Sequence, residues 1–187
     1  DVEQTLNYYL DACIAHTNID DDFIPSVFPG LRQGTVGSAF GCEEYRVEDQ
    51  FYIKPIIKAV DDIYKLKRPD VCNVGLTKFF IDRIGEMHRL SGGSIPVHCC
   101  DMQGIVSIAA KMWNDSDLML AFYDQPQAVH HLFDLITNAF IEFARALIDV
   151  TEGTLVPIHC MPYTWFPPGE GMSISEDYLA LISPDIF

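Results

Sequence analysis

The chain contains nearly the same short apolar segment twice. Ile95-Pro96-Val97-His98-Cys99 recurs as Val156-Pro157-Ile158-His159-Cys160, with helical sequence before each copy. Helix, strand, helix and strand in alternation are typical of parallel βα units. We therefore expect buried strands at Ser94 to Cys100 and Thr154 to Cys160. Two copies form an echo of one βα unit and do not establish a short-period repeat.

Apolar residues recur at helical spacing around these two segments. The expected helices are Val2 to Ala15, Tyr52 to Leu66, Gly75 to Leu90, Ile105 to Trp113, a short helix through Tyr123 with its cap region at Asp115-Ser116-Asp117, and Pro126 to about Val150. Helical residues are expected again from Glu176. Between Asp20 and Gly41 the sequence is rich in Pro and Gly and predicts a long loop. Loops of this kind are usually functional or cover a site.

The charge balance excludes several classes of partner. Acidic residues outnumber basic ones 27 to 12, giving a net charge of −15. Nucleic acid and anionic membrane surfaces both need a cationic face, so we expect neither as a partner. No apolar run reaches the roughly 18 residues that a membrane span requires. The six cysteines are irregularly spaced, which favours reduced thiols and a cytoplasmic location.

Residues that carry chemistry gather where the two predicted strands end. In parallel βα barrels these carboxyl ends face the active-site mouth, which predicts that His98, Cys100 and Asp101 lie beside His159 and Cys160. Zinc prefers imidazole and thiolate ligands, and residues two apart share one side of a strand. Alternatively, the cysteines are small buried hydrophobic residues and the histidines are hydrogen-bonded polar groups. The spacing leaves both interpretations open.

Other candidate residues lie in loops and at helix starts. Asp101 and Glu176 are candidate acid/base or hydrogen-bonding groups, although Glu176 also fits the acidic first turn of a capped helix. Tyr163 and Trp165 lie between prolines in a loop that is expected over the barrel mouth. There they cover a flat ligand or pack against a neighbouring loop. The long Pro/Gly loop keeps Arg32 and Gln33 within reach of a docked ligand.

Several motifs, taken in their order, resemble the uroporphyrinogen decarboxylase superfamily. These motifs are Ala39-Phe40-Gly41, Asp62 to Leu66, Ile95-Pro96-Val97, Asp101-Met102-Gln103-Gly104, Asp124 to His130, Leu135-Ile136-Thr137, Ser175-Glu176-Asp177 and Leu181 to Asp185. The resemblance covers about Asp20 to the end of the chain. It implies an α/β fold, the (β/α)8 TIM barrel.

A complete barrel of this type needs about 250 residues, so we interpret residues 1–187 as one partial TIM-barrel domain, about half of the whole. Half a barrel leaves open sheet edges. We therefore expect either missing flanking sequence or a homo-oligomer that covers those edges.

The superfamily includes decarboxylases, methylcobalamin:coenzyme M-type methyltransferases and relatives of cobalamin-independent methionine synthase. The chain departs from the decarboxylase pattern, because it lacks their arginine-rich amino-terminal loop and has Ala39 to Glu43 where a catalytic aspartate is expected. It has Cys160 in place of a substrate-contacting serine, and Ala110 near the position of the active-site tyrosine. A substrate with eight carboxylates also suits a net charge of −15 poorly.

The resemblance therefore implies methyl transfer between a corrinoid or related donor and a thiol, with zinc lowering the pKa of the thiol. The substrate is a small molecule or a corrinoid protein. The family's usual zinc ligands lie in its carboxyl-terminal half, beyond Phe187. Two alternatives stay open: a uroporphyrinogen-type decarboxylase in tetrapyrrole biosynthesis, and a non-catalytic corrinoid-binding or partner module.

The predicted site has three groups of residues. The catalytic candidates are His98, Asp101, His159 and Glu176. The substrate-binding candidates are Arg32, Gln33, Gln103, Tyr163 and Trp165. The metal-binding candidates are Cys100 and Cys160.

Overall fold

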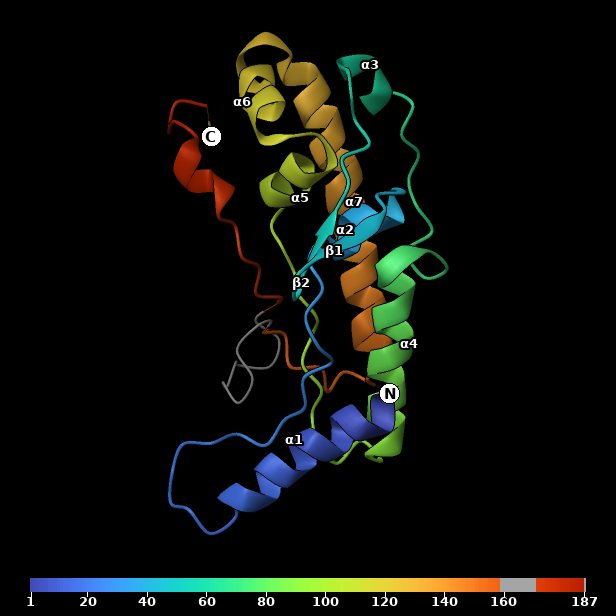
Figure 1. Ribbon diagram of the computed structural model, residues 1–187, viewed down its shortest axis with the longest axis vertical. Coiled ribbons are helices and arrows are strands. Elements are labelled where there is room, and N and C mark those ends of the chain that lie inside the picture. The colour runs from blue at the N-terminus through green and yellow to red at the C-terminus, as the bar shows by residue number, and fades with distance from the viewer. Residues whose placement is uncertain (159–170, 187) are drawn as a thin grey trace. The chain divides into compact units, whose positions relative to one another are not determined.

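The computed structural model describes residues 1–158 and 171–186 (Figure 1). The chain forms two compact units, each built from three separate stretches of sequence. Unit 1 comprises Asp1–Leu31, Lys78–Met102 and Ala144–Ile174, and unit 2 comprises Arg32–Thr77, Gln103–Phe143 and Ser175–Phe187. Each unit therefore depends on contacts between segments that are far apart in the sequence.

The longer helices lie where the apolar spacing predicts them. They are α1 (Val2–His16), α4 (Gly75–Leu90), α5 (Ile105–Met112), α6 (Asp115–Asp124) and α7 (Pro126–Val150). The first residues of α1 and α7 show why these two helices begin where the sequence predicts. The Asp1 carboxylate accepts hydrogen bonds from the first amides of α1, and Pro126 occupies the first position of α7, where an N–H has no partner within the helix.

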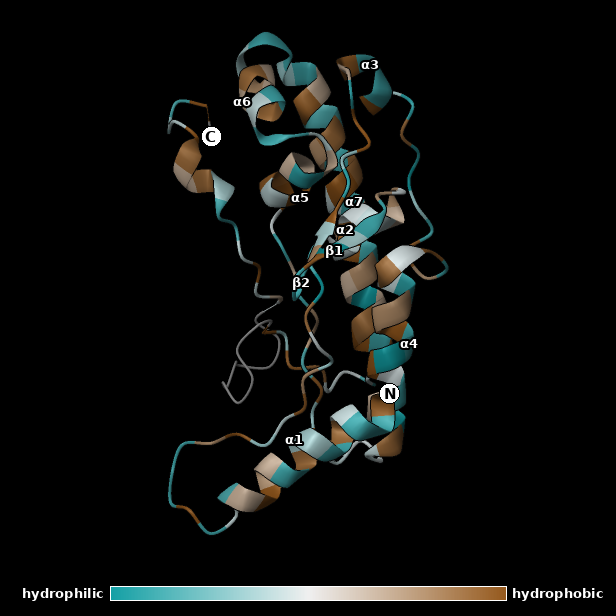
Figure 2. Ribbon diagram, viewed as in Figure 1, coloured by the Kyte–Doolittle hydropathy of each residue, from teal (hydrophilic) through white to brown (hydrophobic). Residues whose placement is uncertain are grey.

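Helix α7 is amphipathic, and both apolar and polar residues occur along its length (Figure 2). Leu132, Ile136, Phe143 and Leu147 are fully buried. Their spacing of four and seven residues puts them on one face of the helix. Burial of each such side chain contributes about 1.5–3 kcal/mol. None of the described helices is both long and apolar enough to cross a bilayer.

Three extended segments of unit 1 pair in parallel. Val27 pairs with Val97, and His98 pairs with Val156. The backbone bonds include His98 N–H to Val27 C=O at 2.8 Å and Cys99 N–H to Val156 C=O at 3.0 Å. The parallel arrangement predicted for the two echoed segments is therefore confirmed at this point of contact.

The pairing is shorter than the predicted strands. Instead of continuous strands at Ser94 to Cys100 and Thr154 to Cys160, the structure has isolated bridges at Val97, His98 and Val156. Each echoed segment contains a proline, Pro96 or Pro157, which has no N–H to donate to a neighbouring strand. The repeated proline thus explains why the ladder is limited.

Unit 2 contains a β-hairpin and several short helices besides α5, α6 and most of α7. These elements are α2 (Thr35–Ala39), β1 (Glu44–Val47), β2 (Gln50–Ile53), α3 (Val60–Ile63) and the 3-10 helix η1 (Tyr178–Leu181). Strands β1 and β2 are antiparallel, and Tyr45 pairs with Tyr52 across them. The unit also contains one parallel bridge, between Gln103 and Ser175.

Two expectations from the sequence differ from the structure in this region. The predicted helix from Tyr52 to Leu66 is wrong over most of its length, because Tyr52 belongs to β2 and α3 covers only Val60–Ile63. Pro55 prevents a helix from continuing through this region, and cross-strand aromatic pairs such as Tyr45 with Tyr52 stabilise the hairpin. The predicted loop from Asp20 to Gly41 contains the helix α2 as well as the paired residue Val27.

Helix α6 begins with a side-chain cap one residue before the predicted cap region. The Asn114 side-chain oxygen accepts a hydrogen bond from the Asp117 amide at 2.9 Å. We expect Asn114→Ala to lower the free energy of unfolding by about 1 kcal/mol, the usual contribution of an N-cap. Urea unfolding measures this loss. Asn114→Ser retains a capping oxygen and is the matched control, so equal losses in both variants would contradict the prediction.

Candidate functional site

The first turn of α5 in unit 2 binds a carboxylate of the same chain. Glu176 accepts hydrogen bonds from the Val106 amide at 2.9 Å, the Ser107 amide at 3.0 Å and the Ser107 hydroxyl at 2.6 Å. The helix dipole adds to these bonds, because the amino-terminal end of a helix attracts negative charge. One interpretation of the sequence makes Glu176 part of the capped first turn of the helix that follows it. The structure shows that Glu176 also caps α5.

Gly104 makes this contact sterically possible. A Cβ atom at this position would lie 2.0 Å from Glu176 Oε2 and 2.5 Å from its Cδ. The Gly104 amide also donates to the Ser175 carbonyl at 2.6 Å. The segment that carries Glu176 is therefore held against the start of α5 both by backbone pairing and by its side chain.

Gln103 lies at the same place and keeps part of its side chain available. Its Oε1 atom accepts a hydrogen bond from the Gly34 amide at 3.3 Å. Gly34 is the N-cap of α2 and has φ +74. Residues with a side chain rarely adopt this backbone conformation. Among the described residues, the Gln103 Nε2 group has no hydrogen-bond partner. It thus has two N–H donors to offer to a ligand.

Gln33 and Arg32 contact other side chains of unit 2. Gln33 Oε1 accepts a hydrogen bond from Lys111 Nζ at 3.3 Å. The Arg32 guanidinium pairs with Glu44 at 2.5 Å and lies 3.9 Å from the centre of the Phe51 ring. These contacts hold Arg32 within its own chain.

One carboxylate oxygen of Glu44, Oε1, is buried without a hydrogen-bond partner among the described residues. An unsatisfied buried acceptor is unfavourable by about 1–3 kcal/mol. Because the atom is enclosed by the chain, it is not open to a ligand in this conformation.

His98 in unit 1 joins the three parallel segments. It is fully buried, with Nδ1 at 2.9 Å from the Ile158 carbonyl oxygen and Nε2 at 2.8 Å from Ser26 Oγ. Burial lowers the pKa of His98 below its ordinary value of 6.5, although the bond to Ile158 opposes the shift. A neutral imidazole fits these partners, since Nδ1–H donates to the carbonyl and Nε2 accepts from the hydroxyl.

Two further candidates of unit 1 are also buried, the metal-binding candidate Cys100 and the catalytic candidate Asp101. Cys100 is fully enclosed, and Asp101 is 7% exposed. No group of three or more His, Cys, Asp or Glu side chains within residues 1–158 and 171–186 is arranged to hold a metal ion. Cys13, Cys42, Cys72, Cys99 and Cys100 are not joined in disulfides.

The predicted site residues fall into different parts of the structure. His98, Cys100 and Asp101 belong to unit 1, whereas Arg32, Gln33, Gln103 and Glu176 belong to unit 2. His159, Cys160, Tyr163 and Trp165 lie outside the described residues. The catalytic, substrate-binding and metal-binding roles of all these residues stay predictions.

Some residues of the site were not predicted from the sequence. Gly104, Ser107 and Lys111 contact predicted residues in unit 2, and Ser26 contacts His98 in unit 1. Gly104 had a sequence signal, a glycine directly before an apolar helix. The others are ordinary polar residues whose partners are distant in the sequence.

Comparison with known proteins gives the chain a family. The family model of uroporphyrinogen decarboxylase (URO-D) matches residues 34–154, more than half of the chain. A search of curated proteins gave no significant match. Among solved structures, a methyltransferase from Methanosarcina mazei superimposes with a TM-score of 0.69 at 17% identity, over 100% of this chain and 50% of that one. The present chain thus spans half the length of that structure, and the likeness concerns the fold alone. By the match to its family model, the chain belongs to the uroporphyrinogen decarboxylase family.

Proposed function

We propose that the chain is about half of a (β/α)8 barrel enzyme that transfers a methyl group between a corrinoid or related donor and a thiol. The family membership and the fold similarity to a methyltransferase support this proposal. The parallel pairing of Val97 and His98 with neighbouring segments is compatible with a barrel of parallel strands. The donor enters either as a free cofactor or on a corrinoid protein.

The observation that most favours methyl transfer over decarboxylation is the arrangement of the arginines. A tetrapyrrole with many carboxylates needs several free guanidinium groups that converge on one pocket. All six arginines lie in the described residues. The four that form ion pairs with acidic groups of the same chain are Arg32, Arg46, Arg68 and Arg89. A fifth, Arg83, donates to the Pro29 carbonyl and the Thr5 hydroxyl.

The described residues do not fit a zinc ion. Both ring nitrogens of His98 already have partners, and no group of three possible ligands is present within the described part of the chain. Zinc therefore stays a prediction that depends on Cys160 and on His159, outside the described residues.

Unit 2 provides the groups that we propose for substrate binding. The free amide of Gln103 donates hydrogen bonds to the substrate, and Lys111 with Gln33 supplies further polar contacts. The five described cysteines, which form no disulfide, suit the reducing cytoplasm, where we propose that the reaction takes place.

The proposal is tested by incubating the purified protein with methylcobalamin and a thiol. We expect loss of the methylcobalamin absorption spectrum together with formation of the methyl thioether. Gln103→Leu is expected to lower kcat/KM about tenfold, because it removes a polar contact to the substrate worth about 1.4 kcal/mol. Gln127→Leu, on the exposed side of α7, is the matched control and leaves kcat/KM unchanged.

Three outcomes would contradict the proposal in different ways. Decarboxylation of uroporphyrinogen without methyl transfer would make the chain a decarboxylase. Corrinoid binding with no turnover would indicate a binding module. Methyl transfer that is unchanged by Gln103→Leu would keep the reaction and remove Gln103 from the binding site.

A further inference from the structure

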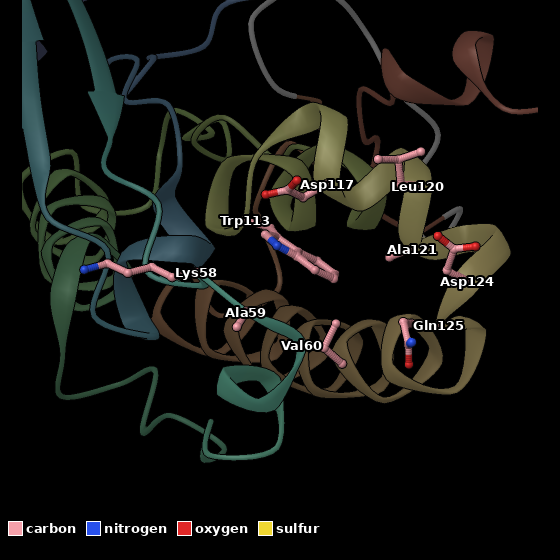
Figure 3. A pocket seen from close by; sticks show the side chains of 9 residues that line it. All are labelled: Lys58, Ala59, Val60, Trp113, Asp117, Leu120, Ala121, Asp124 and Gln125. Carbon is pink, nitrogen blue, oxygen red and sulfur yellow. The ribbon is translucent and has the colours of Figure 1, made fainter.

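Unit 2 has a surface pocket that is distinct from the residues around the first turn of α5 (Figure 3). Its volume is about 300 Å³, near the lower limit for small-molecule sites. The lining residues are Lys58, Ala59, Val60, Trp113, Asp117, Leu120, Ala121, Asp124 and Gln125. None of them is a residue that the sequence or the proposed function assigns to a site.

The walls of the pocket combine an apolar part with charged and polar side chains. Helix α6 contributes residues at positions 117, 120, 121 and 124, a spacing that puts them on one face. In Figure 3 the Trp113 indole lies at the centre, with Val60 and Ala59 on the opposite side from α6. Trp113 is only 3% exposed, so it forms the floor of the pocket and not a freely accessible ring. This surface suits a short hydrocarbon group.

Two carboxylates of α6 flank this apolar surface. Asp117 and Asp124 are seven residues apart, which corresponds to about 10 Å along a helix. Asp117 already accepts a hydrogen bond from the Asn114 side-chain amide, and its own backbone amide donates to the Asn114 side-chain oxygen in the helix cap. Within the described part of the chain, the Asp124 side chain has no hydrogen bond or ion pair. Asp124 is therefore the carboxylate that is more available to a ligand.

The charges around the pocket are not balanced by a cation of the chain. Lys58 is the one basic residue among those that line it, and Figure 3 shows its amino group directed away from the other labelled side chains. No salt bridge joins Lys58 to either aspartate among the described residues. A net charge of −15 further raises the local concentration of cations.

We infer that this pocket binds a small organic cation, a protonated amine that carries a short hydrocarbon chain. The apolar floor takes the hydrocarbon part, and Asp124 attracts the ammonium group. A metal ion is disfavoured, because the described residues contain no group of three ligands here or elsewhere. The inference does not depend on the proposed methyl transfer.

Three probes of similar shape test the inference: butylammonium, butanol and butyrate. The chain has two tryptophans, Trp113 and Trp165, so Trp165→Phe leaves the indole of the pocket as the single fluorescent reporter. We expect saturable fluorescence changes with butylammonium, weaker binding of butanol and none of butyrate. Asp124→Asn is expected to weaken butylammonium binding about fivefold, the contribution of a favourable exposed charge pair. Asp117→Asn is expected to weaken butylammonium binding less, by about twofold.

The matched control is Asp134→Asn, which removes an exposed aspartate of α7 that does not line the pocket. Circular dichroism checks that every variant is folded. Equal weakening by Asp134→Asn and Asp124→Asn would reduce the effect to general electrostatics and overturn the inference. Equal binding of butanol and butylammonium, or binding of butyrate that Lys58→Ala abolishes, would overturn it as well.

Discussion

Replacing Gly104 with alanine is expected to lower the free energy of unfolding by about 2–3 kcal/mol. The new methyl group would lie 2.0 Å from Glu176 Oε2, so the carboxylate has to leave the first turn of α5. Glu176 then loses its bonds to the Val106 and Ser107 amides and to the Ser107 hydroxyl. Hydrogen bonds to a charged group contribute about 1.5–3 kcal/mol, and helix caps about 1 kcal/mol.

The backbone itself does not oppose the substitution. Gly104 has φ −70 and ψ 166, an extended conformation that alanine adopts readily. Alanine in place of glycine at an N-cap otherwise costs less than about 1 kcal/mol. Most of the expected loss is therefore steric, and this part requires the Glu176 side chain to be present.

A double-mutant cycle tests this cause. We expect Glu176→Ala alone to lower the free energy of unfolding by about as much as Gly104→Ala, since both remove the same hydrogen bonds. In the Glu176→Ala background, Gly104→Ala is expected to cost only the intrinsic N-cap difference, less than about 1 kcal/mol. Glu176→Gln keeps the shape of the side chain and is the matched control, with an intermediate loss of about 1 kcal/mol.

Urea unfolding of the four proteins gives the coupling energy directly. Additive losses from Gly104→Ala and Glu176→Ala would contradict the proposed contact. So would a Gly104→Ala variant as stable as the wild type. Hydrogen exchange at the Val106 and Ser107 amides adds a local measurement, because both should exchange faster in every variant that displaces the carboxylate.

The sequence predicts the helices well because their determinants are local. Helix α4 (Gly75–Leu90) begins and ends at the predicted residues, and glycines at positions 92 and 93 follow its end with positive φ. The hairpin is different. Glu48, which has φ 53, and Asp49 join its strands. Neither is the Gly or Asn that usually marks such a turn, so the sequence does not indicate the turn, and the helix predicted from Tyr52 includes the end of β2.

The candidate site shows the same difference between features with local sequence signals and contacts between distant residues. Family motifs identified Gln103 and Glu176, each directly adjacent to a recognisable segment. Their partners are far away in the sequence: Gly34 is 69 residues from Gln103, and Ser107 is 69 residues from Glu176. No periodicity connects residues at such separations. The finding that Glu176 caps α5 therefore required the three-dimensional structure.

His98 illustrates how an isolated residue type misleads. A histidine at a strand end suggests a metal ligand or a catalytic base, yet both of its ring nitrogens are engaged inside unit 1. The alternative interpretation, a buried and hydrogen-bonded polar group, describes the observed contacts. It also predicts a large effect on stability, which an exposed catalytic histidine would not have.

Replacing His98 with alanine is expected to lower the free energy of unfolding by about 3–4 kcal/mol. The change removes the hydrogen bonds to Ile158 and Ser26 and leaves a cavity where three parallel segments meet. His98→Asn retains an N–H group close to the position of Nδ1 and is expected to lose only about half as much. Chemical unfolding at pH 8 measures both losses.

His98 should also make stability depend on pH. Because burial lowers its pKa in the folded protein below 6.5, the unfolded chain takes up a proton at this residue before the folded chain does. Stability contributed by His98 is therefore complete above about pH 7.5 and decreases as the pH falls through 6.5, by at most about 1.4 kcal/mol per pH unit. Asparagine does not titrate, so His98→Asn should have a shallower decrease between pH 7.5 and pH 5.

The difference between the two pH profiles isolates His98 from the other titrating groups, which both proteins share. Parallel profiles would mean that the folded protein binds a proton at His98 as readily as the unfolded chain does. The hydrogen-bond partners of this buried imidazole are a carbonyl and a hydroxyl, neither of which is a carboxylate that would stabilise the charge. Parallel profiles would therefore also contradict the burial of His98 between the three segments.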